Sequence, residues 1–159
     1  MRILLWVLVL ATTFSCGYKT ATLNHSDICI KHVDIDYPEP TLVDTLNRVV
    51  ADALIQSGKK LNCSLKKQYD VFIKVKSFGF YPIGHSPSQR ASVYKVYIKL
   101  TLEIRNKEGV SLLKKDIYET TQYFGSGLKA DIERRYALEE IGRLIKVRIY
   151  NILLTNRLT

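Results

Sequence analysis

The chain has 159 residues, of which 47% are hydrophobic and 25% are charged, so it can form one compact domain but not two full catalytic domains. These fractions are ordinary for globular proteins and exclude collagen-like, coiled-coil and wholly disordered chains. Lysine and arginine total 24 against 15 aspartate and glutamate residues, a formal charge of +9. This excess predicts an anionic partner such as nucleic acid, acidic lipid or an acidic protein surface.

The N-terminus has the pattern of an export signal. Met1-Arg2 supplies positive charge, and an uninterrupted apolar run follows at 3–11. Such a run covers only about 14 Å as a helix, half the hydrocarbon thickness of a bilayer, so it cannot span a membrane. It predicts a signal peptide over 1–15.

A small residue, Ser15, directly precedes Cys16, as at a bacterial lipoprotein cleavage site. We expect the mature chain to begin at a lipidated Cys16, with ordinary secretion as the alternative. A tether at 16–27 would then lead into a single domain at 28–159.

The pattern in the first half of this domain predicts a strand, a helix and a second strand. Apolar residues alternate with polar ones from Ile28 over about eight residues, which predicts a strand. Over 41–57 the apolar residues are spaced one and three positions apart, as on one face of a helix. The segment 62–64 is a short edge strand or a loop. Alternation resumes at 71–81, which predicts the next strand.

The pattern in the second half predicts two more strands and a long helix. Turn-forming residues at 82–90 predict a loop, and the strand that follows, 94–105, alternates apolar and polar residues throughout. A short turn then leads into an antiparallel neighbour at about 111–122. Apolar residues at steps of three and four predict a long helix at about 129–155.

These elements predict an α+β fold, a two-layer sandwich with two helices packed on one face of a mixed, mostly antiparallel sheet of about four strands. The other sheet face would be uncovered and rich in aromatic and lysine side chains. It could stack bases and neutralise phosphates, contact lipid A, dock another protein, or simply be solvated. The side chains expected there are Phe72, Lys74, Lys76, Phe78, Lys95, Tyr97 and Lys99.

Nucleic acid is the least favoured of these partners. Residues 76–81 match an RNA-binding motif at four of six positions, but Ser77 replaces a glycine and Pro82 follows where the strand should continue. The export signal also takes the chain away from RNA. We therefore expect no nucleic acid partner.

The sequence offers little for catalysis. His25, His32 and His85 are scattered, and neither a nucleophile motif nor a glycine-rich phosphate loop occurs. The sequence thus predicts no enzyme, no cofactor and no metal site. In an oxidising compartment Cys29 and Cys63 could form a disulfide, with two buried free thiols as the alternative.

The order of features resembles the LPS-assembly lipoprotein family, LptE, over essentially all of the mature chain. The segments that carry the resemblance are Cys16-Gly17-Tyr18, 36–40, 42–56, 69–78, 94–105 and 118–123, followed by the long final helix.

The resemblance implies a non-catalytic outer-membrane lipoprotein, anchored on the periplasmic side through its N-terminal lipid. It would form a heterodimer with the lipopolysaccharide-transport barrel LptD, plug and stabilise that barrel, and assist lipopolysaccharide insertion. In the family, basic residues near the loop between the second and third long strands are linked to lipopolysaccharide contact. By their position at this loop, Arg90 and Lys95 would contact lipopolysaccharide. The alternative is a freestanding envelope lipoprotein that binds an anionic polymer and has no obligate barrel.

Overall fold

The computed structural model describes residues 27–35, 39–64, 68–85, 91–125 and 130–156. The predicted signal peptide, Cys16 and nearly all of the tether lie outside these residues, as does Arg90. The elements, in chain order, are β1 (Asp27–Asp34), α2 (Pro40–Gln56), β2 (Lys60–Leu61), β3 (Tyr69–His85), β4 (Ala91–Asn106), β5 (Ser111–Phe124) and α3 (Ala130–Thr155).

The two helices agree closely with the periodicity of the sequence. Helix α2 begins at Pro40, whose fixed φ and missing N–H suit the first helical turn. It ends before Gly58, which adopts φ 81° and whose N–H donates to the Ile55 carbonyl. Lys59 donates to the Leu54 carbonyl, so the helix closes with the hydrogen-bond pattern of a Schellman motif.

The sheet has five strands in the order β2-β1-β3-β4-β5. β1 pairs in parallel with β2 and β3, whereas β3, β4 and β5 form an antiparallel meander. The α+β class and the mixed, mostly antiparallel sheet are therefore confirmed. The strand that exceeds the expected four is β2, which has only two residues.

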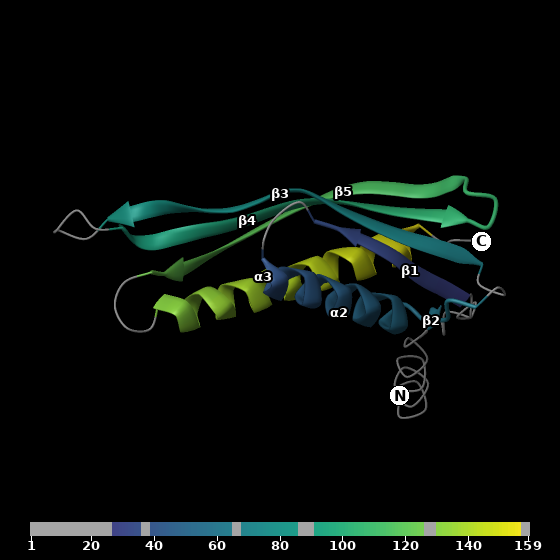
Figure 1. Cartoon of the computed structure of the whole chain (residues 1–159), viewed down its shortest axis with the longest axis horizontal. Coiled ribbons are helices and arrows are strands. Elements are labelled where there is room, and N and C mark those ends of the chain that lie inside the picture. The colour runs from purple at the N-terminus through teal and green to yellow at the C-terminus, as the bar shows by residue number, and fades with distance from the viewer. Residues whose placement is uncertain (1–26, 36–38, 65–67, 86–90, 126–129, 157–159) are drawn as a thin grey trace, which may run out of the picture.

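Both helices lie on the same side of the sheet, as Figure 1 shows. The core between the layers takes the inward-facing side chains of the strands, among them Val71, Ile73, Leu100 and Ile104, each no more than 1% exposed. The helices contribute residues such as Ile145. Within the described ranges the opposite face of the sheet is therefore not covered by a helix.

Strand β3 is longer than the sequence predicts. The expected loop at 82–90 was wrong for its first four residues, because β3 continues to His85 and Pro82 pairs with Tyr94 of β4. β1 pairs with β3 only as far as Lys74, so among the described residues the later part of β3 has no partner on that side. A proline is tolerated there because its missing N–H breaks no bond to a further strand.

Candidate functional site

The open sheet face carries the aromatic and lysine side chains that the sequence placed there, with one exception. Lys74, Lys76 and Lys99 are exposed, and Phe72, Lys95 and Tyr97 are half-buried. Their neighbours along β3 and β4 point into the core. The strands therefore present a cationic and aromatic surface on the side away from the helices.

Phe78 is the exception, and its predicted place on the open face was wrong. The pairing of β3 with β4 shifts between Val75 and Ser77, so β3 holds one extra residue at that point. Such a bulge reverses which side chains face the core. Phe78 is consequently 8% exposed and belongs to the hydrophobic core.

A pocket of about 280 Å³ opens on this face at the end near β1. The aromatic ring of Phe72 is part of its lining, and the Arg105 guanidinium carbon lies 4.7 Å from the ring centroid. The complete lining is His32, Asp34, Phe72, Ile73, Lys74, Lys76, Thr101, Glu103, Arg105 and Lys114. The pocket thus combines an apolar surface with charged groups of both signs.

Ion pairs between strands organise the charges around the pocket. Lys76 Nζ lies 2.9 Å from Asp116 Oδ1 of β5, which also accepts a 2.7 Å hydrogen bond from the Thr101 hydroxyl. On the β1 side, Lys74 Nζ lies 3.2 Å from Asp34 Oδ2. These contacts connect the open face across β1, β3, β4 and β5.

The pKa values of two carboxyls in this region, Asp116 and Glu103, are lowered by their hydrogen-bond donors. The hydrogen bond from Lys76, and then that from Thr101, lowers the pKa of the Asp116 carboxyl. Similarly, the 2.9 Å hydrogen bond from Arg105 Nε lowers the pKa of Glu103. Neither carboxyl would carry a proton to donate at neutral pH, so both act here as hydrogen-bond acceptors and as partners of cations.

Three lysines on this face have no acidic partner within 4.0 Å in the described part of the chain: Lys95, Lys99 and Lys114. Lys95 and Lys99 lie on the same face of β4, four residues apart. Lys99 and Lys114 interact electrostatically with Asp116 and Glu103 at longer range. Lysines without a direct ion pair on an exposed strand face leave a positive potential available to an anionic partner. The open face is therefore one surface of the described part of the chain where positive charge is available to an anionic partner.

Aromatic rings occupy the end of this face that is distant from β1. The rings of Tyr81 and Tyr97 lie 5.8 Å apart between centroids. Tyr97 also covers Gly79, because a Cβ on this glycine would lie 2.9 Å from the Tyr97 hydroxyl. Lys95 is at this end, whereas Arg90, its expected companion, lies outside the described residues.

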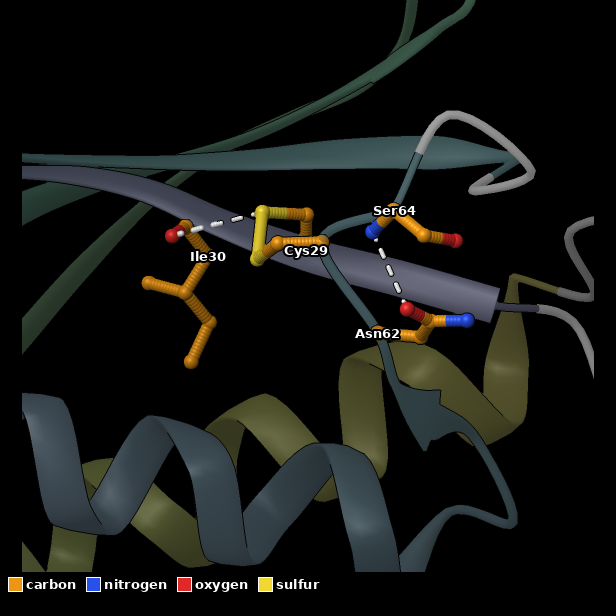
Figure 2. Close-up of a disulfide and its surroundings, with 5 residues drawn as sticks. Cys29, Ile30, Asn62 and Ser64 are labelled. Carbon is orange, nitrogen blue, oxygen red and sulfur yellow. Dashed lines mark hydrogen bonds between the residues drawn. A yellow bond between two sulfur atoms is a disulfide. The ribbon is translucent and has the colours of Figure 1, made fainter.

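Cys29 and Cys63 are joined by a disulfide, with their Cα atoms 4.7 Å apart. Figure 2 shows the bond between β1 and the segment that follows β2. The side-chain amide of Asn62 donates a 2.7 Å hydrogen bond to Asp27, and its backbone N–H donates to the Ile28 carbonyl. This segment is thus fastened to β1 both covalently and by hydrogen bonds.

The alternation of the strand at 94–105 places Glu103 and Arg105 on the same face as Lys95 and Lys99, but neither these two residues nor Asp116 was predicted to belong to a site. Their alternation along β4 and β5 indicates that they share the polar face. Only the pairing of strands brings Asp116 to Lys76, which lies 40 residues earlier in the chain.

The described ranges lack both a metal-binding cluster and a membrane-spanning helix. No group of three or more histidine, cysteine, aspartate or glutamate side chains there could hold a metal ion. Neither of the two helices in those ranges is long and apolar enough to cross a membrane.

Comparison with known proteins places the fold among those of bacterial lipoproteins. No family model matches the chain. An uncharacterized protein of Aquifex aeolicus (strain VF5) is 28% identical over 125 residues, which cover 77% of this chain and 81% of that protein.

Two solved structures share the architecture. Rare lipoprotein B from Shewanella oneidensis superposes with a TM-score of 0.57 at 13% identity, covering 82% of this chain and 95% of that one. Uncharacterized lipoprotein B from Nitrosomonas europaea gives a TM-score of 0.52 at 11% identity, covering 89% and 94%. At these identities the likeness concerns the fold, which is one that bacterial lipoproteins adopt.

Proposed function

We propose that this protein is a non-catalytic outer-membrane lipoprotein, anchored through Cys16, that plugs and stabilises the lipopolysaccharide-transport barrel and contacts lipopolysaccharide. The observation that carries the proposal is the open sheet face, where lysines without a direct ion pair and the rings of Tyr81 and Tyr97 lie on one side of a two-layer body. Lipopolysaccharide is a multiply charged anion, so it needs cations at a fixed spacing. A barrel lumen is polar, so a plug within it needs a polar and charged exterior.

Two observations support this proposal. The order of features in the sequence resembles the LPS-assembly lipoprotein family over essentially all of the mature chain. Independently, the fold is similar to solved bacterial lipoproteins, including rare lipoprotein B of Shewanella oneidensis. The export pattern at 1–15 and the cysteine at position 16 agree with a lipid-anchored envelope protein.

The barrel partnership is tested by purification at native expression levels. A C-terminally tagged chain is extracted from envelopes in mild detergent, and its companions are identified by mass spectrometry. We expect a stable one-to-one complex with the lipopolysaccharide-transport barrel and an acylated Cys16. Repeated recovery of the protein alone would contradict the plug role.

The contact with lipopolysaccharide is tested by reversing charge on the open face. Lys95→Glu combined with Lys99→Glu should weaken lipopolysaccharide binding by the purified protein at least tenfold, since each change replaces an attraction with a repulsion. The matched control is Arg135→Glu together with Lys146→Glu on helix α3, which changes the net charge equally. Equal losses in both variants would show a nonspecific charge effect.

The alternative, a freestanding envelope lipoprotein that binds an anionic polymer, predicts a different outcome. In that case deletion of the protein would leave barrel assembly and the detergent sensitivity of cells unchanged. Loss of assembled barrel together with increased detergent sensitivity would support the plug.

A further inference from the structure

The pocket near β1 has the size of a small-molecule site. Its volume is about 280 Å³, whereas a cavity of about 150 Å³ holds one benzene molecule. The pocket is therefore large enough for a molecule with two fused rings. Neither Lys95 nor Lys99, the residues chosen to test contact with lipopolysaccharide, belongs to its lining.

Flat side chains form one side of this pocket. Phe72 is half-buried on β3, and the Arg105 guanidinium carbon lies 4.7 Å from the centroid of its ring. His32 of β1 is the register partner of Phe72, so the two side chains are neighbours on the same sheet face. Aromatic rings pack well against other rings and against guanidinium groups. This side of the pocket therefore suits a flat apolar group.

Lys114 is the lysine of the lining that has no acidic oxygen within 4.0 Å among the described residues. It faces Glu103 across the pairing of β4 with β5, but Arg105 donates to both oxygens of that carboxylate. The distances are 2.9 Å from Nε to Oε1 and 2.9 Å from Nη2 to Oε2. Such a two-point contact is stronger than a single hydrogen bond to an ammonium group, so Arg105 holds the carboxylate and Lys114 interacts with it only at longer range.

We propose that this pocket binds a small aromatic anion, with its flat ring against Phe72 and its anionic group at Lys114. His32, Phe72, Glu103 and Lys114 are successive register partners across the four strands. Phe72 and Lys114 are thus two strand spacings apart, about 10 Å between Cα atoms. A carboxylate on two fused rings is long enough to connect the Phe72 ring with the lysine side chain. The site is independent of the proposed barrel partnership.

The probe for this site is naphthoate, and the neutral naphthamide of the same shape is its matched ligand control. Both are titrated into the isotope-labelled full chain in mild detergent, and the backbone amides are followed by NMR. We expect saturable shifts at the amides of the pocket lining. Because only naphthoate can pair with Lys114, it should bind about threefold more tightly than naphthamide.

Variants separate the contribution of the ring from that of the charge. Phe72→Leu should weaken the binding of both ligands by about threefold to tenfold, because it removes the ring contact. Lys114→Gln should weaken naphthoate by about threefold and leave naphthamide unchanged. The control is Lys115→Gln, which changes the net charge equally. Lys115 pairs with the core residue Leu102, so it lies on the other side of the sheet and its loss should affect neither ligand.

Detergent takes up each ligand to the same extent in all variants, so differences between variants report on the pocket. Circular dichroism verifies that each variant is folded, and Lys114→Gln tests the site even if Phe72→Leu lowers stability. Equal affinity of the parent for the two ligands, equal losses in Lys114→Gln and Lys115→Gln, or unchanged binding by a folded Phe72→Leu variant would overturn the proposal. None of these results bears on the barrel complex, which is assayed separately by co-purification.

Discussion

Gly142 of α3 packs against α2 at a place with no room for a side chain. A Cβ on Gly142 would lie 2.7 Å from Thr45 Cγ2 and 3.2 Å from Val49 Cγ1. Both neighbours are buried, at 6% and 7% exposure, so neither can move into solvent. Gly142→Ala therefore tests how tightly the helical layer is packed.

Two opposing effects determine the result of this substitution. Alanine favours a helix interior over glycine by about 1 kcal/mol. Overpacking a close contact costs about 1–3 kcal/mol. Because a 2.7 Å contact is well inside the van der Waals distance, we expect the steric cost to win, with a net loss of up to about 2 kcal/mol in the free energy of unfolding.

Urea unfolding followed by circular dichroism measures this loss, and a double-mutant cycle identifies its cause. Thr45→Ser removes the Cγ2 atom that the new methyl group would strike. In that background Gly142→Ala should become neutral or stabilising by up to about 1 kcal/mol. If Gly142→Ala stabilises the parent protein, or has the same effect in both backgrounds, the packing argument is refuted.

Three further predictions concern the disulfide, the open face and the core. Replacing both Cys29 and Cys63 by serine should lower the unfolding free energy by about 2–4 kcal/mol, since the bond spans 34 residues, and reduced parent protein should unfold at the same urea concentration as this variant. The pKa of Asp116 is lowered by Lys76, so its contribution to stability is present above the unfolded pKa of about 3.9 and is lost as pH falls through the folded value. Asp116→Asn should therefore be less stable than the parent at pH 7, and urea midpoints measured down to pH 2 should converge; a constant difference would contradict this. Phe78→Ala should cost about 3–4 kcal/mol by urea unfolding because the ring is in the core, and a loss below about 1 kcal/mol would place it on the surface.

Much of the open face could be predicted because alternation along a strand is a local property. The apolar residues of β4 between Tyr94 and Ile104 fix which side of that strand faces the core, so Lys95, Tyr97 and Lys99 follow on the other side. The same reasoning failed at Phe78. A bulge arises where one strand has one more residue than its partner over the same stretch. The sequence of β3 alone does not show how many residues of β4 lie opposite it.

The pocket could not be predicted from the sequence, for a related reason. Its lining comes from β1, β3, β4 and β5, and its ion pairs join residues far apart in the chain, such as Lys76 and Asp116. Strand order and register decide which charges meet. The disulfide was likewise left open by the sequence, because its formation depends on the distance between two Cα atoms.

The amino-acid sequence by itself determined the helices, the main strands, the α+β class and the excess of positive charge, since each depends on residue type and on spacing within one segment. The tertiary structure alone decided the bulge that buries Phe78, the extension of β3 past Pro82 and the partner of each charged group. These features depend on contacts between segments that are distant in sequence. A single strand is compatible with several registers, and only its pairing with the neighbouring strands decides which register buries the apolar side chains and pairs the charges.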